Sequence, residues 1–201
     1  MKKYELTDET VRVGLRTLYR VRALCDIPGW GVRAGDLGGF VEAERNLSQF
    51  GEAWVSDAAW VSGEAWVSGE AWVSGDARVS GNAWVSGNAW VSGNAQVFGA
   101  ARVSGDARVY GADLLHVTGL PSGNVTFYPT KDGWQLNVGC WTGTVDGLEE
   151  LIGSDEWPEA TGEERELRRP GLVALVGLCR AHVESVAARS VGDGEKETRN
   201  D

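Results

Sequence analysis

A six-residue unit recurs ten times without a gap between residues 52 and 111, and this period constrains the fold more than any other feature. The second residue of every unit is alanine, from Ala53 to Ala107, and the fourth is always valine, from Val55 to Val109. Alternate residues of an extended segment point to the same side, so alanine and valine share one side. Each unit therefore predicts a short strand with a small apolar interior.

Each unit also carries a turn signal. Most units close with serine and glycine, followed by Asn, Asp or Glu, a combination typical of tight turns with positive φ. A glycine at every sixth position would cost a helix about 1 kcal/mol each time, and a sandwich of hairpins would need longer strands. The pattern predicts a parallel β-solenoid in which each strand pairs with its equivalent in the next coil.

The unit Val-Ser-Gly-Asn-Ala-Trp resembles the hexapeptide repeat of left-handed parallel β-helices. That resemblance implies a triangular coil of three hexads, about 18 residues long, with coils about 4.8 Å apart. The period alone also allows four hexads per coil. With three, the outward residues form three columns: Trp54, Trp72, Trp90 and Arg108; Trp60, Arg78 and Gln96; Trp66, Trp84 and Arg102.

The chain outside the repeat predicts three further segments. Residues 1–33 form an N-terminal β cap, with strands at 3–6 and 17–24 around a turn-prone stretch at 7–14. The solenoid covers residues 34–119 and opens with an imperfect, glycine-rich coil, because a bare end would expose strand edges. Residues 120–191 form a hairpin-and-helix module, and the polar residues 192–201 form a disordered tail.

The C-terminal module contains a hairpin signal, Asp-Gly, between apolar runs at 125–129 and 134–141. We expect a short helix over residues 147–152, capped by Asp146, then an acidic link over 153–159 and a helical stretch from residue 163. Pro170 starts or kinks a longer helix whose apolar face should pack on the hairpin. That face consists of Leu172, Leu175, Val176, Cys179, Val183 and Val186.

Composition narrows the class of protein. The formal net charge of −10 and the sequence pI near 4.7 argue against general binding to nucleic acid or to an anionic membrane surface. We find no run apolar enough to span a bilayer and no signal peptide, which favours the cytoplasm. Cys25, Cys140 and Cys179 suggest neither a disulfide framework nor a zinc site, and no metal or cofactor is expected.

Several stretches outside the repeat resemble small phage- or prophage-encoded hexapeptide-repeat proteins. They are Tyr4-Glu-Leu-Thr-Asp, Ala34-Gly-Asp-Leu-Gly-Gly-Phe-Val-Glu and Phe127-Tyr-Pro-Thr-Lys-Asp-Gly, among others. The resemblance implies a protein that acts in the cytoplasm of a bacterial host and interferes with a host process. It carries no catalytic or binding residue over to this chain.

Catalysis is the runner-up hypothesis. Enzymes with a similar repeat are commonly acyltransferases, which use coenzyme A and a histidine general base in a loop beside a groove between subunits. This chain offers His116, where the repeat breaks down, and His182, which lies between apolar positions of the expected helix. The carbonic anhydrase branch of the fold needs three histidine ligands and is excluded. The uninterrupted hexads lack a catalytic loop, so we favour a protein that is not an enzyme.

Binding through the outer surface is the preferred hypothesis. Tryptophan at outward positions would leave a large exposed apolar surface, and similar hexapeptide proteins form trimers of parallel prisms. We therefore expect a homotrimer whose interface includes Trp54, Trp60, Trp66, Trp72 and Trp84. In an alternative without a small ligand, these columns bind a host protein or serve a structural role.

The last coil suggests a ligand site, because arginine replaces tryptophan there and aromatic residues replace the corner serine. Guanidinium groups beside aromatic rings suit a nucleotide-like ligand through bidentate hydrogen bonds and stacking. The expected ligand-binding residues are Arg102, Arg108, Tyr110, Phe98 and Trp90. The alternative is that they only cover the junction between the solenoid and the C-terminal module.

Overall fold

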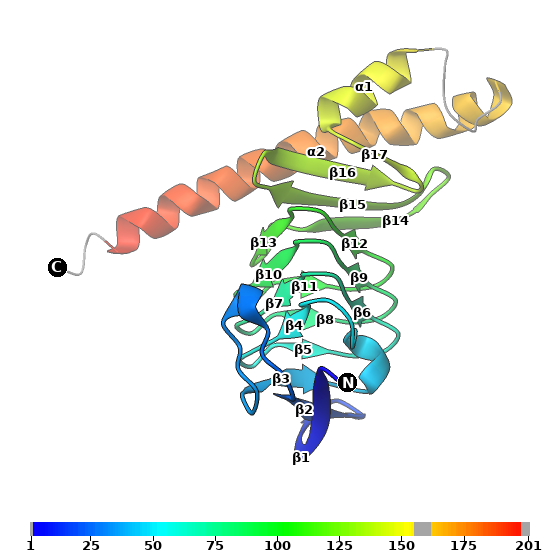
Figure 1. The fold of residues 1–201 in the computed structure, drawn as a ribbon. Helices are drawn as coiled ribbons and strands as arrows, with labels where there is room; N and C mark the ends of the chain where they lie inside the picture. The colour runs from blue at the N-terminus through cyan, green and yellow to red at the C-terminus, as the bar shows by residue number, and fades with distance from the viewer. Residues whose placement is uncertain (1, 155–161, 198–201) are drawn as a thin grey trace. The chain divides into compact units, whose positions relative to one another are not determined.

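The computed structural model describes residues 2–154 and 162–197, and the chain divides into two compact units (Figure 1). The first unit contains residues 1–114 and 128–133, and the second contains residues 115–127 and 134–201. The N-terminal cap and the solenoid thus belong to one unit. The helices and the remaining C-terminal strands belong to the other.

The repeat forms a parallel β-solenoid of very short strands. Partner residues lie 18 positions apart, as in the pairs of Trp54 with Trp72 and of Trp60 with Arg78. This register confirms three hexads per coil and the three predicted outward columns. The strands are β4 (Trp54–Val55), β5 (Trp60–Val61), β6 (Trp66–Val67), β7 (Trp72–Val73), β8 (Arg78–Val79), β9 (Trp84–Val85), β10 (Trp90–Ser92), β11 (Gln96–Val97), β12 (Arg102–Val103) and β13 (Arg108–Tyr110).

We name the three sides of the solenoid by their strands. The first face consists of β4, β7, β10 and β13, the second of β5, β8 and β11, and the third of β6, β9 and β12. The repeated alanines and valines fill the interior, and each is at most 1 % exposed. The predicted division into a small apolar inside and a bulky outside is therefore confirmed.

The corners explain the glycine at the end of each unit. Gly81 has a φ of 72°, a left-handed conformation that residues with a side chain rarely adopt. A Cβ added there would lie 2.9 Å from the backbone nitrogen of Gly99, its equivalent in the next coil. Glycine therefore lets successive corners stack as closely as the strands do. At one corner Asp57 takes this role with a φ of 57°, and its carboxylate accepts a hydrogen bond from the Gly75 amide at 2.9 Å.

An antiparallel hairpin covers the opening edge of the second face. The strands β1 (Tyr4–Val13), β2 (Arg16–Ala23) and β3 (Leu37–Val41) continue the sheet of β5, β8 and β11, and β3 pairs in parallel with β5. Two 3₁₀ turns flank β3: η1 (Pro28–Trp30) precedes it and η2 (Glu44–Asn46) follows it. The expected cap and opening coil are present, but the turn predicted at residues 7–14 is wrong. The first strand runs on to Val13 with a register shift after Leu6.

Asn46 fixes the opening coil from inside. Its side chain is fully buried, and its Nδ2 donates to the carbonyl oxygens of Gly63 at 2.9 Å and Ala65 at 2.8 Å. Its Oδ1 accepts from the Ala43 amide at 2.8 Å. One amide side chain thereby satisfies three backbone groups that have no strand partner, which keeps the irregular coil in register with the first regular one.

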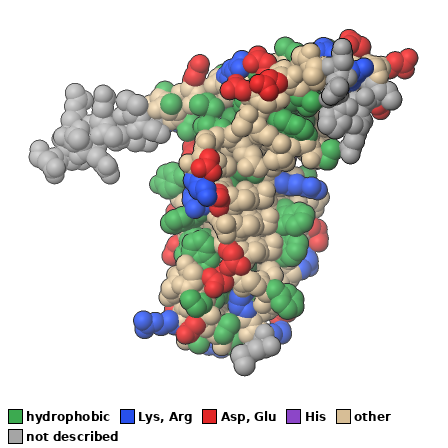
Figure 2. Space-filling model, turned by 45° about the horizontal axis from the view of Figure 1, so that its top comes forward, with side chains coloured by type: hydrophobic (Ala, Val, Ile, Leu, Met, Phe, Trp, Pro, Cys, Tyr) green, Lys and Arg blue, Asp and Glu red, His purple; other side chains and the backbone are tan. Residues whose placement is uncertain are grey.

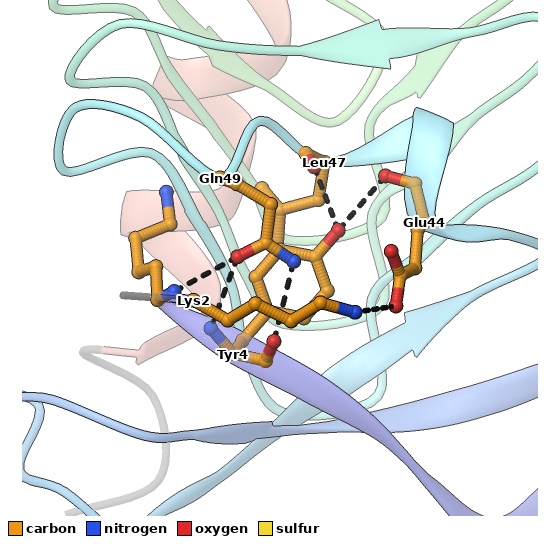
Figure 3. Close-up of polar contacts among 6 residues, drawn as sticks. Lys2, Tyr4, Glu44, Leu47 and Gln49 are labelled. Carbon is orange, nitrogen blue, oxygen red and sulfur yellow. Dashed lines mark hydrogen bonds and ion pairs between the residues drawn. The ribbon is translucent and has the colours of Figure 1, made fainter.

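The first residues of the chain are tied to the segment between η2 and β4, as Figure 3 shows. The Gln49 side chain accepts from the Lys3 amide at 2.8 Å and donates to the Tyr4 carbonyl at 3.2 Å. The Tyr4 hydroxyl lies 2.7 Å from the Leu47 carbonyl oxygen. The Lys3 ammonium is buried and donates to the Ala53 carbonyl at 2.7 Å.

Burial of Lys3 predicts a pH-dependent stability. Burial lowers the pKa of Lys3 from 10.5 to about 8, so between these values the unfolded chain binds more protons than the folded one. The stability of the fold should therefore rise with pH from about 8 to 10. Burial raises the pKa of Tyr4 above its ordinary value of 10.0. Above pH 10 the unfolded chain therefore loses the Tyr4 proton before the folded chain does, and the stability that the Tyr4 hydroxyl contributes falls as the pH rises further. We expect the urea midpoint of unfolding to pass through a maximum near pH 10.

Lys2 provides the matched control, because it carries the same charge on an exposed side chain. The Lys3→Met variant should lose the rise in urea midpoint between pH 8 and 10, whereas Lys2→Met should keep it. Identical pH profiles for the two variants would show that the Lys3 ammonium is not the responsible group.

The second unit contains a four-stranded antiparallel sheet and two helices. The strands pair in chain order and are β14 (Leu115–Leu120), β15 (Gly123–Thr130), β16 (Gly133–Val138) and β17 (Trp141–Gly143). The end of β15, residues 128–130, and the first residue of β16, Gly133, group with the first unit. The helices are α1 (Val145–Gly153) and α2 (Gly162–Glu197). The predicted hairpin and the packing of Leu172, Leu175, Val176 and Cys179 against Val125 and Phe127 are confirmed.

Three details of this unit differ from expectation. Thr144, not Asp146, caps α1, because its Oγ1 accepts a hydrogen bond from the Gly147 amide at 3.1 Å. Pro170 lies inside a single helix that continues through residues 192–197, which were expected in the disordered tail. The expected acidic link falls mostly on residues 155–161, and these, like residues 198–201, lie outside the described residues.

The segment Gly162–Arg189 of α2 also corrects the expectation about apolar runs. An 18-residue window of this segment has a mean hydropathy of 1.4. By length and composition alone, the segment could cross a membrane. Of that window 22 % is buried, and α2 contributes four buried side chains to the core of its unit.

Candidate functional site

The outward residues of the first face form a continuous column that ends in an arginine. Trp72 pairs with Trp90, and Trp90 pairs with Arg108 in the next coil. The Arg108 guanidinium lies 5.7 Å from the centre of the Trp90 ring, a distance at which a cation is attracted to the ring face. Its Nη1 also donates to the carbonyl oxygens of Asn88 at 2.9 Å and Ala107 at 3.0 Å.

The third face repeats this arrangement. Trp66 and Trp84 stack with ring centroids 5.3 Å apart at an angle of 28°, and the Arg102 guanidinium lies 5.9 Å from the Trp84 ring. The Trp84 indole donates a hydrogen bond to the Ser68 hydroxyl at 3.4 Å. Stacking and the parallel backbone together hold these side chains in one column.

Exposure separates the three faces. Trp90 on the first face is 42 % exposed, and Trp66 and Trp84 on the third are 41 % and 40 % exposed. On the second face Trp60 is half-buried beneath Arg78, whose guanidinium lies 6.0 Å from its ring. Figure 2 shows hydrophobic side chains standing out along the flanks of the solenoid. The exposed indoles therefore concentrate on the first and third faces.

Three of the predicted interface residues have less free surface than expected: Trp60, which is half-buried on the second face, and Trp54 and Trp72 on the first. Trp54 is only 1 % exposed, since the N-terminal cap covers it, and a Cβ at Gly38 would lie 2.7 Å from its ring. Trp54 therefore offers almost no free surface to another subunit. Trp30 of η1 packs on Trp72 with ring centroids 4.8 Å apart, which leaves Trp72 half-buried.

The five predicted ligand-binding residues are spread over two faces and two corners of one chain. Trp90 and Arg108 lie on the first face, and Tyr110 follows them at its corner, 67 % exposed with its ring against Gly93. Arg102 lies on the third face, and Phe98, 51 % exposed, stands at the corner between the second and third faces. The single chain thus presents two separate arginine-capped aromatic columns.

One corner joins the two faces that carry these columns. It contains the side chains of Glu70, Asn88 and Asp106 at successive levels. Asn88 donates to Asp106 at 3.1 Å, and Lys131 forms an ion pair with Asp106 at 2.7 Å. The hydrogen bond from Lys131 is the main cause that lowers the pKa of Asp106. Polar groups at this corner are therefore paired along the solenoid axis, between the two columns.

Both histidines lie in the second unit. His116 is in β14, and its Nδ1 lies 2.6 Å from the Val125 carbonyl oxygen, which can only accept, so Nδ1 carries a proton. The other ring nitrogen is buried. His182 packs edge-on against Trp134 and Phe127, with ring centroids 5.6 and 6.2 Å away. His116 is therefore bound through Nδ1 within its own sheet, and His182 is half-buried against two aromatic rings.

Sequence reasoning missed two features of the surface. The first is Trp30, whose Gly-Trp-Gly context gave no sign that it would reach the first face. The second is a cleft in the second unit, lined by Trp134, Asp146, Arg180 and Glu184 among others. The i,i+4 spacing of Arg180 and Glu184 on an expected helix could have indicated one side of that cleft.

Two stretches of the chain match the YdcK beta-solenoid repeat. The matched residues are 71–87 and 101–116, which include Arg78, Arg102, Arg108 and His116. The YdcK-type match agrees with a repeat β-helix and carries no activity with it. The chain matches no curated protein.

Proposed function

We propose that the chain is a non-catalytic, homotrimeric binding protein that holds a nucleotide-like anion between neighbouring subunits. One observation carries the proposal: the exposed indoles lie on the two faces that adjoin a single corner, whereas the second face carries arginine, glutamine and a half-buried tryptophan. Surfaces of this kind usually mark an interface. A threefold axis beside that corner brings the first face of one subunit opposite the third face of the next.

Three prisms arranged in this way leave a wedge-shaped groove at each junction. One wall of the groove contributes Trp90 and Arg108, and the other contributes Trp84 and Arg102. The two arginines are six residues apart in the repeat, so their heights differ by less than one coil spacing of about 4.8 Å. Two guanidinium groups that face each other repel unless an anion lies between them. Phosphate is the group that they bind bidentately.

A nucleotide satisfies both parts of such a groove, because its phosphate suits the arginines and its base suits the aromatic rings. We favour sequestration of a nucleotide over its conversion, since both histidines belong to the second unit and neither lies on the solenoid columns. The phage-like stretches of the sequence suggest that the nucleotide is a host immune signal and that the role is counter-defence in the bacterial cytoplasm.

Subunit mixing tests the junction directly. We expect calorimetric titration of wild-type protein against a panel of cyclic nucleotides to show binding, and Arg102→Ala and Arg108→Ala each to abolish it. Mixing the two variants after partial denaturation and refolding should restore part of the binding. In mixed trimers some junctions pair the intact Arg102 of one subunit with the intact Arg108 of another.

Arg78→Ala serves as the control, because Arg78 also lies over a tryptophan but on the second face. Its binding should equal that of the wild type. Absence of binding across the panel would refute the proposal that the ligand is a nucleotide. Binding that is lost in both variants and not restored by mixing would refute a site shared between subunits.

A further inference from the structure

The second unit contains a cleft of about 440 Å³ between the sheet, the start of α1 and the middle of α2. Its apolar lining comes from Phe127, Trp134, Val145 and Val183. The volume lies within the usual range for small-ligand sites, about 300 to 1,000 Å³. All lining residues belong to the same compact unit, so the cleft is a property of that unit alone.

The aromatic wall of the cleft is held rigidly. Phe127 and Trp134 stack with ring centroids 4.8 Å apart at 26°, and His182 packs edge-on against both rings. Phe127 is fully buried, which fixes the position of the ring next to it. A preformed aromatic wall offers a ligand contact area without an ordering cost.

The rim of the cleft is acidic overall. Asp146 in the first turn of α1 and Glu184 on α2 contribute carboxylates, and Arg180 contributes the cation. That cation is already matched, since its Nη2 lies 2.6 Å from a Glu149 oxygen and 3.2 Å from an Asp146 oxygen. These hydrogen bonds are the main cause that raises the pKa of Arg180. The rim therefore carries two carboxylates and one guanidinium, and Glu149 outside the lining also pairs with that guanidinium, which leaves an excess of negative charge.

From the aromatic wall and the acidic rim we infer that this cleft binds an alkylammonium group. The positive head would lie near Glu184 and Asp146, where the ring faces and the carboxylates attract it. The aliphatic stem would lie along Val145, Val183 and Trp134. This chemistry is shared by a lysine side chain of a partner polypeptide and by a free diamine. The site is independent of the proposed nucleotide groove, which lies in the other unit.

The experiment titrates the full chain by calorimetry with three probes. These are cadaverine, a blocked Gly-Lys-Gly peptide, and pentanoate, which has a similar apolar stem and the opposite charge. We expect saturable binding of at least one ammonium probe and none of pentanoate. Tighter binding of the peptide identifies a lysine side chain as the source, and tighter binding of cadaverine identifies a free amine.

Matched charge variants locate the binding. Glu184→Gln should weaken the affinity about two- to fivefold, the range of a partly exposed ion pair. Glu150→Gln removes the same charge from an exposed position of α1 outside the cleft and should leave the affinity unchanged. The proposal is overturned if no ammonium probe saturates, if pentanoate binds equally well, or if the two variants behave alike.

Discussion

The Val79→Asp variant is expected not to fold. Val79 is fully buried in the interior of the solenoid, between Val61 in the coil before it and Val97 in the coil after it. An aspartate there has only alanine and valine side chains around it. Burying an unpaired carboxyl group in such a place costs roughly several kcal/mol, even when the group is protonated and uncharged. The whole stability of a domain is about 5–15 kcal/mol. Circular dichroism should show no cooperative unfolding transition.

Arg78→Asp provides the matched control, since it introduces the same side chain at the neighbouring position, on the outward side of the same strand. It removes only the contact of the guanidinium with Trp60, worth about 0.5–1 kcal/mol at an exposed site. This variant should fold and unfold cooperatively. A folded Val79→Asp protein with the stability of Arg78→Asp would mean that the valines do not line the interior.

The second large effect concerns assembly. Replacing both Trp66 and Trp84 with glutamine should dissociate the proposed trimer into single chains, because it removes two of the three indoles that are about 40 % exposed among the described residues. Aromatic side chains of this kind dominate the energetics of interfaces. The fold should survive, since Gln96 already occupies an equivalent outward position on the second face.

Trp60→Gln makes the same replacement on the second face, where we propose no contact between subunits. Its mass in solution should equal that of the wild type, and its circular dichroism should match that of the double variant. If Trp60→Gln also dissociates the assembly, the first and third faces are not the walls of the junction.

The inside, the outside and the corners of the solenoid could be predicted from local patterns. Alternation places Ala and Val inside, and the six-residue period places the corners. The pairing of strands 18 residues apart followed from the hexapeptide resemblance, since the period alone also allows four hexads per coil. The same period also places Arg102 and Arg108 on different faces of the solenoid, so the predicted columns already assigned the two arginines to separate faces. Their proximity in sequence suggested a single patch, which the faces do not provide.

The parts that could not be predicted depend on contacts between distant residues. The burial of Trp54 and Trp72 results from an N-terminal cap that folds back over the first face, and no local pattern encodes that return. Likewise, Asn46 and Lys3 act on backbone groups that a regular strand would satisfy by itself. The cleft of the second unit brings together residues from β15, β16, α1 and α2, which are up to 57 positions apart, from Phe127 to Glu184.

Native mass spectrometry of the wild-type chain tests the central claim most directly. If the exposed indoles of the first and third faces meet across a threefold axis, the dominant species has three times the chain mass of 21.6 kDa. A dominant species of 21.6 kDa at concentrations well above those in the cell would show that these columns face solvent. In that case no groove between subunits exists to hold an anion between Arg102 and Arg108.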